Sequence, residues 1–408
     1  MKRLSIILIL LACTGSADAE TVQTFVSPDS SFEAVSGFID DAESTLLISS
    51  YTFSSPEIAG MLREKSDDGV RITLMVEKSP AGGMSSYQES SLCILAESNI
   101  TVMLYDGSLK YMHAKYIVKD SNEFLITSEN FGYSGFFPDG TYGNRGWGAI
   151  SDGPVASELA ALFAEDISFS IPFTCTMDAY EPEEWNTKGA YSPLFGTVSF
   201  KNQKIRLIYS PDSLDEIVSL IESAEEYVIV QEFYIYTHWG SPSKDTTESS
   251  PSPVIAALLE KARSGVPVRV MLDSSYYNME PEKSVSNYNT IGNLTEAAES
   301  EGIPIKAVPI DLSALGLAVL HNEGVIIDGK KVLVSSINWN ENSIMNNRET
   351  GLIIEGEAAG YYMNVFGFDE TGAPQENGFG AVPALMSLAA VSVIAFYFSR
   401  RKPSKVFL

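Results

Sequence analysis

Residues 111–131 read YMHAKYIVKDSNEFLITSENF, and the same pattern returns at residues 320–339 as LHNEGVIIDGKKVLVSSINW. The polar residues at matching offsets are His113, Lys115, Asp120, Ser128 and Asn130 in the first copy and His321, Glu323, Asp328, Ser336 and Asn338 in the second. Apolar runs separate them, so each copy predicts two adjacent strands. Because residues two apart on a strand face the same way, we expect the polar side chains of each strand pair to gather beside one anion.

Two copies of this spacing resemble the motif of the phospholipase D superfamily. That motif is His-any-Lys, four residues, Asp, six residues, and then Gly/Ser/Thr-Ser-any-Asn. The resemblance implies an α/β fold of two pseudo-twofold related repeats, each a mixed, mostly parallel sheet flanked by helices. It further implies that the two motifs meet in one active site at the repeat interface.

The same resemblance implies a phosphoric diester hydrolase that works through a phosphohistidine. One histidine attacks phosphorus, the other protonates the leaving oxygen, and water hydrolyses the intermediate; an imidazole of pKa ~6.5 suits both roles. By resemblance His113 is the nucleophile and His321 the general acid, although the sequence itself does not order the two. The resemblance assigns phosphate binding to Lys115, Ser128, Asn130, Ser336 and Asn338, and a structural role to Asp120 and Asp328. It implies no cofactor and no metal, and the third histidine, His238, lacks a metal-ligand spacing.

Two positions depart from the family pattern. Glu323 stands where the second motif lysine belongs, and it replaces an attraction of roughly 4 kcal/mol for phosphate by a comparable repulsion. Unless it is protonated, turned away or paired with Lys330 or Lys331, it predicts a large loss of rate. The family also places Asn-Arg-Glu after each motif to fix a catalytic imidazole. Residues 347–349 fit and make Glu349 a candidate support, whereas residues 144–146 end in glycine and lack the acid.

The body of the chain reads as an internal repeat. Both repeats open with Ser-Pro-Asp-Ser, an apolar-periodic helix and an apolar strand, and strands alternating with helices predict layered α/β domains. Ser30 with Glu33, and Ser213 with Glu216, fit capping boxes. We predict repeat one over residues 21–185, a linker over 186–203, repeat two over 204–357 and a stalk over 358–378.

The ends of the chain read as targeting segments. Residues 1–19 have a basic start, an apolar run and a small-any-small cleavage site, as in a secretory signal peptide. A lipoprotein signal at Cys13 is the alternative. Residues 379–398 carry no charge and are long enough to span a bilayer, and the basic residues in 399–408 would stay in the cytoplasm. These segments predict a single-pass membrane protein whose body is extracellular.

The C-terminal tail also resembles the sorting tails of archaeal surface-anchored proteins, although Asn377 replaces the proline of that motif. A permanent helix and a processed tail are therefore both open. In an extracellular body, Cys93 and Cys175 are able to form a disulfide.

The charge of the chain bears on the substrate. The 408 residues include 53 acidic and 27 basic side chains, a net charge of −26 that disfavours binding of a nucleic-acid backbone. With the tether, this favours a phospholipid substrate over nucleic acid. Two alternatives stay open: a catalytically weakened or inactive surface binding protein on the same fold, and a secreted nuclease with a local basic cleft. The oligomeric state is not predicted.

Overall fold

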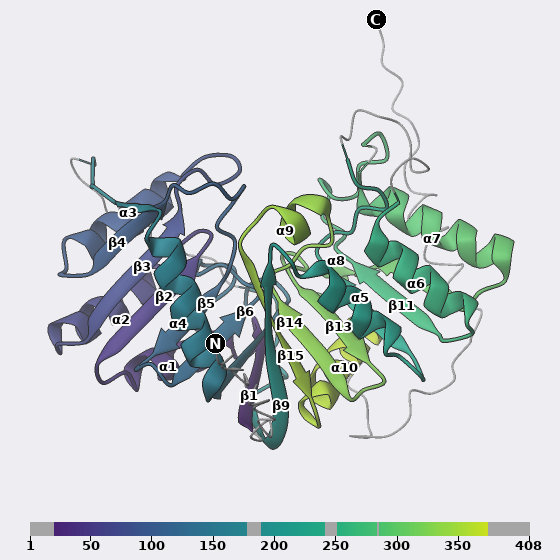
Figure 1. Cartoon of the computed structure of the whole chain (residues 1–408), viewed down its shortest axis with the longest axis horizontal. Coiled ribbons are helices and arrows are strands. Elements are labelled where there is room, and N and C mark those ends of the chain that lie inside the picture. Colours follow the sequence, from purple (N-terminus) through teal and green to yellow (C-terminus); the bar gives the residue numbers. More distant parts are fainter. Residues whose placement is uncertain (1–19, 178–188, 241–250, 284, 374–408) are drawn as a thin grey trace, which may run out of the picture. The chain divides into compact units, whose positions relative to one another are not determined.

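The computed structural model describes residues 20–177, 189–240, 251–283 and 285–373, which belong to one compact unit (Figure 1). The elements of repeat one are β1 (Glu20–Ser27), α1 (Ser31–Asp40), β2 (Thr45–Ser50), α2 (Pro56–Asp67), β3 (Arg71–Glu77), α3 (Ser86–Ala96), β4 (Thr101–Tyr105), β5 (Tyr116–Lys119), β6 (Glu123–Thr127), β7 (Gly146–Asp152), α4 (Pro154–Ile167) and β8 (Ser170–Pro172).

Repeat two follows a similar succession, with two additional short helices, α8 and α9, and no counterpart of β8. They are β9 (Val198–Ser210), α5 (Leu214–Glu222), β10 (Val228–Glu232), α6 (Pro253–Arg263), β11 (Val268–Leu272), α7 (Asn287–Glu301), β12 (Ile305–Pro309), α8 (Leu312–Leu315), β13 (Glu323–Ile327), β14 (Lys331–Ser335), α9 (Glu341–Met345), β15 (Glu349–Glu355) and α10 (Ala358–Thr371). Each motif therefore forms an antiparallel hairpin, β5–β6 or β13–β14, as predicted.

From the central β9–β1 pair outward, the strands follow the same order in both repeats, and repeat one adds β8 at its edge. Its strand order is β12-β11-β10-β13-β14-β15-β9-β1-β7-β6-β5-β2-β3-β4-β8, and the antiparallel pair β9–β1 joins the two repeats. Parallel pairing joins β2–β3–β4 and β10–β11–β12, whereas the motif strands pair antiparallel. This arrangement confirms the predicted mixed α/β fold of two related repeats.

Three apolar clusters hold the layers together. Helices α1, α2 and α3 pack on one face of repeat one, and α5, α6 and α7 pack in the same way on repeat two. The third cluster draws residues from both repeats and includes Phe163 of α4, Tyr362 of α10 and Trp147 of β7. Figure 1 shows α4 and α10 near the centre of the molecule. Burial of this shared cluster fixes the two motif hairpins relative to each other.

Some predicted boundaries and caps are wrong. Residues 358–371, expected in a stalk, form α10, whose apolar face enters the shared core. Strand β9 begins at Val198, inside the predicted linker. The capping boxes also fail, because Ser30 accepts from the Val26 amide and Ser213 bonds Ser210 instead of capping the helices that follow.

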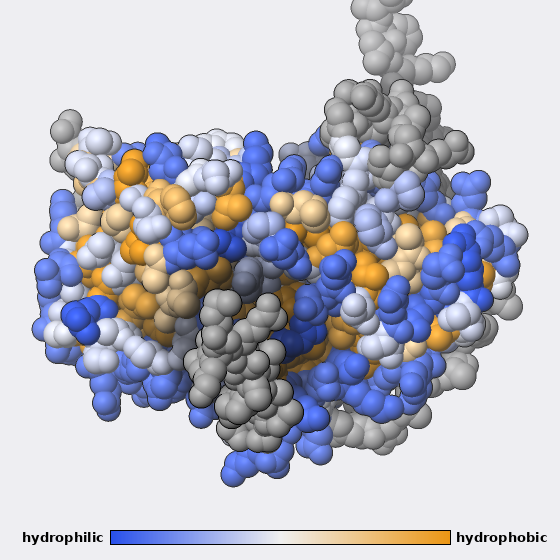
Figure 2. Space-filling model, viewed as in Figure 1, coloured by the Kyte–Doolittle hydropathy of each residue, from blue (hydrophilic) through white to orange (hydrophobic). Residues whose placement is uncertain are grey.

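The signal segment 1–19, the transmembrane segment 379–398 and the basic tail 399–408 lie outside the described residues. Within the described ranges, no helix has the length and apolar character needed to cross a membrane. Figure 2 shows hydrophilic residues spread over both halves of one face, with apolar side chains among them.

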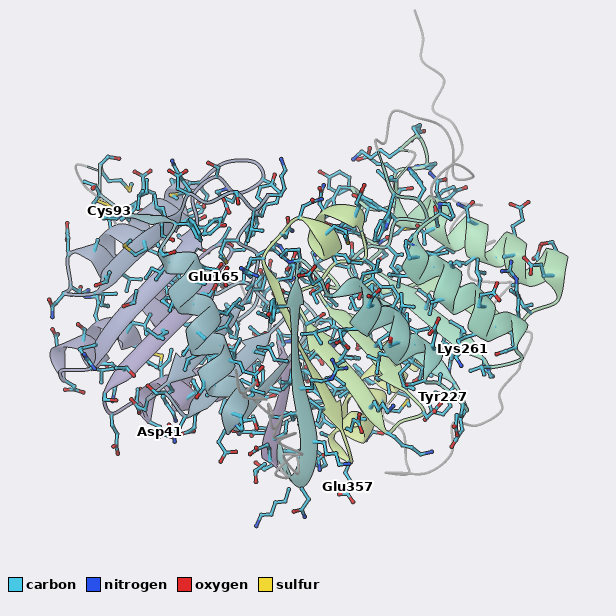
Figure 3. All side chains as sticks on the ribbon, in the orientation of Figure 1. Asp41, Cys93, Glu165, Tyr227, Lys261 and Glu357 are labelled. Carbon is cyan, nitrogen blue, oxygen red and sulfur yellow. A yellow bond between two sulfur atoms is a disulfide. The ribbon has the colours of Figure 1, made fainter. Side chains whose placement is uncertain are left out.

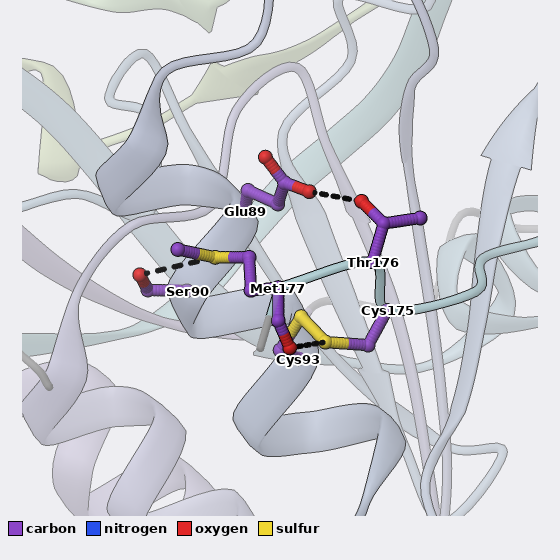
Figure 4. The surroundings of a disulfide bond; sticks show 6 residues. All are labelled: Glu89, Ser90, Cys93, Cys175, Thr176 and Met177. Atoms are coloured by element: carbon purple, nitrogen blue, oxygen red, sulfur yellow. Dashed lines mark hydrogen bonds between the residues drawn. A yellow bond between two sulfur atoms is a disulfide. The ribbon is translucent and has the colours of Figure 1, made fainter. Parts of the chain in front are cut away.

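A disulfide ties the outer edge of repeat one. Cys93 of α3 is bonded to Cys175 in the segment that follows β8, with 5.1 Å between their Cα atoms (Figure 4). The Thr176 hydroxyl donates to Glu89 at 2.8 Å beside it. Figure 3 places Cys93 at the end of the repeat away from the repeat junction.

Candidate active site

The first motif histidine is held by the other repeat. The backbone N–H of His113 donates to the Arg348 carbonyl at 2.8 Å, and its Nδ1 lies 2.7 Å from Glu349 Oε2. Lys115 Nζ donates to the His113 carbonyl at 2.7 Å and lies 3.0 Å from Nδ1. We call His113, Lys115 and Glu349 the first half of the site. The short Glu349 contact assigns the ring proton to Nδ1 and leaves Nε2, which lies 3.4 Å from Lys115 Nζ, as the nitrogen that carries the electron pair.

The second motif histidine is held in the same crossed manner. The backbone N–H of His321 donates to the Arg145 carbonyl at 2.9 Å, and its Nδ1 lies 3.5 Å from Glu129 Oε2. We call His321, Glu323 and Glu129 the second half of the site. Its carboxylate contact is longer than that of the first half and lies outside hydrogen-bond geometry, because His321 Nδ1 has no hydrogen-bond partner among the described residues.

Glu129 supplies the acid that repeat one was expected to lack. A Cβ atom at Gly146 would lie 2.6 Å from Glu129 Cγ and Oε1, so the missing side chain leaves room for this carboxylate. Asn144 donates to Glu129 at 3.0 Å as Asn347 donates to Glu349 at 2.9 Å. The expectation of a missing acid was therefore wrong. An acid inside the first motif, paired with the downstream glycine, was the signal available in the sequence.

The pKa values of the two imidazoles shift in opposite directions. Burial is the largest cause of the lowered pKa of His113, and the Lys115 charge acts in the same direction, while Glu349 opposes both. Burial alone would also lower the pKa of His321, but the carboxylates of Glu129 and Glu323 outweigh it and raise this pKa. The surroundings thus favour the neutral form of the imidazole in the first half and the protonated form of the imidazole in the second.

Buried arginines fasten each repeat to a helix of the other. Arg145 binds Asp369 of α10 at 3.0 Å and Asp29 at 2.6 Å, and Arg348 binds Asp166 of α4 at 2.9 Å. Both arginines follow the asparagines that hold the site carboxylates. Because removal of one partner would leave a buried charge unpaired, these contacts hold the histidine-bearing segments in place.

Comparisons with known proteins give the family. The model described as "Cardiolipin synthase, PLD-like domain" matches residues 35–167 and 217–367. The chain belongs to the phospholipase D superfamily. It therefore stands among the phosphodiester-acting proteins of that superfamily.

Two solved structures share the fold of this phospholipase D-like chain. The phosphatidylserine synthase of Haemophilus influenzae is similar with a TM-score of 0.59 at 11% identity, over 86% of this chain and 87% of that one. The polyphosphate kinase of Porphyromonas gingivalis gives a TM-score of 0.53 at 11% identity, over 86% of this chain and 46% of that one.

A curated relative, "DISARM protein DrmC" of Bacillus paralicheniformis, is 31% identical over 101 residues. The match covers 24% of this chain, and this chain spans about two fifths of that relative's length, 41%.

Both site histidines remain accessible beneath an aromatic ring. Their side chains are each 14% exposed. Tyr51 lies against His113 with ring centroids 4.5 Å apart, and Phe233 lies against His321 at 5.1 Å. The two rings follow equivalent strands, β2 and β10. Each imidazole thus lies against one aromatic ring and keeps part of its surface exposed.

The serines and asparagines divide into two kinds. The Ser336 hydroxyl donates to Glu349 at 2.7 Å, and the Ser128 hydroxyl accepts from the Trp147 amide at 3.1 Å. These contacts place both hydroxyls within the protein framework of the site. The phosphate contact expected of the two serines stays a prediction. Asn130 and Asn338 each have a buried amide oxygen without a hydrogen-bond partner in the described ranges. That oxygen is an acceptor, so a phosphate contact would come from the amide N–H groups of these side chains.

The motif aspartates lie at the far ends of the motif strands and hold turns. Asp120 accepts from the backbone amides of Glu43, Ser44 and Thr45, and these bonds outweigh burial and lower its pKa to about 2. Asp328 accepts in the same way from Glu225, Glu226 and Tyr227, the last of which is labelled in Figure 3. Both aspartates have positive φ angles, 49° and 54°. This placement agrees with the structural role that the resemblance implies.

Glu323 is neither turned out nor paired with the nearby lysines. It is fully buried, while Lys330 binds Glu226 at 2.7 Å and Lys331 binds the Ser223 hydroxyl at 3.1 Å. Facing it on β10 is Glu232, a buried acid that the sequence reasoning missed. His238 is also buried, and no group of three or more potential metal ligands occurs among residues that the structure describes.

Proposed function

We propose that this chain hydrolyses a phosphodiester through a covalent intermediate on His113. The observation that carries the proposal is the pair of crossed imidazole–carboxylate contacts, whose surroundings drive the two histidine pKa values apart. A neutral imidazole is the form that attacks, and an imidazolium is the form that protonates a leaving group. This division supports His113 as nucleophile and His321 as general acid.

In the first step, the Nε2 electron pair of His113 forms a bond to phosphorus. The bond from phosphorus to the leaving oxygen breaks, and that oxygen keeps the electron pair and takes the proton of His321. Lys115, Asn130 and Asn338 bind the non-bridging oxygens as negative charge builds. Glu349 acts as a positioning residue that sets the tautomer of His113. Glu129 acts on His321 through its negative charge, which favours the imidazolium.

In the second step, water attacks phosphorus and gives a proton to His321. The phosphorus–nitrogen bond breaks, and its electron pair returns to His113. The site is thereby restored without an outside acid or base. The two steps place opposite demands on His321, first as acid and then as base, which a histidine meets near neutral pH.

We further propose a phospholipid substrate and an extracellular, membrane-tethered body. The acidic charge of −26 supports a lipid over a nucleic-acid backbone. The Cys93–Cys175 disulfide supports export, because disulfides persist in oxidising compartments. The predicted signal and C-terminal segments add to this argument. Protease added to intact cells should degrade the body; full protection would contradict the topology.

The histidine roles are tested by trapping the intermediate. With bis(p-nitrophenyl) phosphate the leaving group departs without an acid, so His321→Ala should form the adduct on His113 and hydrolyse it slowly. Intact mass should show the added phosphoryl group in His321→Ala and none in His113→Ala. Adduct in the reverse pattern would exchange the two roles. A second assay on phospholipids and on single- and double-stranded DNA identifies the substrate class.

A non-catalytic binding role is the second candidate, and the unpaired acids Glu323 and Glu232 favour it. If wild type binds phosphodiesters but neither turns them over nor forms an adduct, that role replaces the enzyme. His113→Ala serves as the matched variant in both assays, since it should abolish turnover and leave ligand binding measurable.

A further inference from the structure

Two buried carboxyl groups form an unpartnered pair in the second half of the site. Glu232 ends β10 and lies directly opposite Glu323, the first residue of the antiparallel strand β13. Both are 0% exposed, and none of their four carboxyl oxygens has a hydrogen-bond partner in the described ranges. Directly opposed residues project from the same face of a sheet. The opposed carboxyl groups of Glu232 and Glu323 therefore belong to the structure of the site, and the family motif does not account for them.

The strand register puts this pair at the position of the first motif lysine. Glu323 follows His321 by two residues, as Lys115 follows His113. Ser49 lies opposite Tyr116, so the next residue, Ser50, takes the place opposite Lys115 that Glu232 takes opposite Glu323. A lysine–serine pair in one repeat is thus a glutamate–glutamate pair in the other.

The charges around the pair limit its ionisation. The groups that face Glu323 are Glu232 from β10, His321 before β13, Lys115 before β5, Glu349 from β15 and Glu129 after β6. Glu349 and Glu129 already lie against the imidazoles. Two further negative charges would exclude a phosphodiester anion, and two adjacent buried carboxylates do not both ionise readily.

Burial agrees with this limit. It is the largest cause that raises the pKa of Glu323 to about 7, and with the Glu323 charge it raises the pKa of Glu232 well above its usual range. A protonated carboxyl group carries one O–H donor. Here that donor has no acceptor in the described protein, and it stands where the motif binds an anion.

We propose that Glu323, given the phosphodiesterase function above, binds a non-bridging phosphoryl oxygen as a neutral carboxylic acid beside the buried Glu232. Lys115 binds the anion by charge in the first half, and Glu323 binds it by a hydrogen bond in the second. The second motif, with Glu323 in place of lysine, then supports catalysis as long as Glu323 is protonated. Catalysis should fade as Glu323 ionises above a pH of about 7.

The test is the pH dependence of adduct formation from bis(p-nitrophenyl) phosphate, a substrate that needs no proton from His321. The wild-type rate should fall about tenfold per pH unit above the pKa of Glu323, whereas Glu323→Gln keeps a donor at every pH and should lack that fall. Glu323→Ala should lose about 10²-fold at pH near 6. The exposed Glu226→Gln is the matched charge control and should follow wild type.

A second measurement uses only the wild-type protein, so it does not depend on the folding of the buried variants. Diethyl phosphate stays a monoanion over this range, and ligand-observed NMR should show it bound near pH 6 and released near pH 9. Binding of ethanolamine that strengthens near pH 9 would instead assign the pair to a cationic group and overturn the proposal. Superimposable wild-type and Glu323→Gln profiles would also overturn it while the phosphodiesterase function stands. Absence of turnover at every pH, with diethyl phosphate still bound in the expected way, would reject the enzyme and keep the anion contact.

Discussion

The two halves of the site share a backbone and differ in charge. In the first half, Lys115 stands beside His113 and Glu349 contacts the ring at 2.7 Å. In the second, Glu323 replaces the lysine and Glu129 contacts His321 at 3.5 Å. The mirrored strand order places both histidines in equivalent frames. The difference teaches that the arrangement of strands positions the two imidazoles. The neighbouring side chains decide which of the two has the lower pKa.

This difference suits a reaction that needs unlike partners. Burial and the Lys115 charge lower the pKa of His113, while Glu129, joined by Glu323 wherever Glu323 is ionised, raises the pKa of His321. When His321 is protonated, it brings positive charge to the half that lacks a lysine. An acidic residue at the second lysine position is therefore less damaging than a simple Coulomb estimate suggests.

The largest expected effect comes from removing the lysine of the first half. Lys115→Met should lower kcat/KM by about 10³-fold, because an attraction of roughly 4 kcal/mol for the phosphate is lost and the second motif offers no lysine in its place. Lys119→Met is the matched control, since Lys119 is also buried but lies at the far end of β5 beside Glu123. Equal losses in both variants would show a folding effect instead of phosphate binding.

Substitution of the two carboxylates that contact the histidines should lower the rate by different amounts. Glu349→Gln should cost about 10²-fold in rate and Glu129→Gln about tenfold, because the contact to His113 is shorter and fixes the attacking tautomer. Glu129→Gln should also lower the pKa of His321, so the alkaline fall of a natural-substrate profile should move to lower pH. Steady-state pH profiles measure both effects. A larger loss for Glu129→Gln would show that the second half dominates.

The sequence predicted the two-repeat arrangement because the motif residues recur at the same spacings in both repeats. The repeated motif predicted the hairpins, their meeting and the support given by Glu349. It did not place Glu129 or Glu232, because their roles depend on contacts between segments distant in sequence: Glu129 fills space left by Gly146, and Glu232 faces Glu323 only through strand register. Residues 358–371 carry no motif, and only packing against both repeats shows that they form part of the core.

Restoring the lysine should make the halves more alike. Glu323→Lys should raise the rate about tenfold near pH 8, where wild-type Glu323 ionises, and less near pH 6, where it already donates a hydrogen bond. The gain stays below the full Coulomb value because Glu232 would then ionise beside the new lysine. Rates of the two proteins on one diester at both pH values measure this. A folded lysine variant that is no faster at either pH would show that charge at this position does not limit the chemistry.

The smallest expected effect is on stability. The pKa of Glu323 rises on folding from 4.5 to about 7, so the neutral form stabilises the folded state fully below pH 4.5, and this contribution is lost as pH rises through about 7. The loss approaches about 3 kcal/mol near pH 8, or several degrees in Tm. Glu323→Gln stays neutral at every pH. The difference in Tm between this variant and wild type should therefore increase by several degrees, in favour of the variant, from pH near 5 to pH near 8. Thermal unfolding with the exposed Glu226→Gln as control measures the shift. A Tm difference independent of pH would mean that Glu323 keeps one ionisation state throughout, and the charge contrast between the two halves would then be permanent instead of proton-dependent.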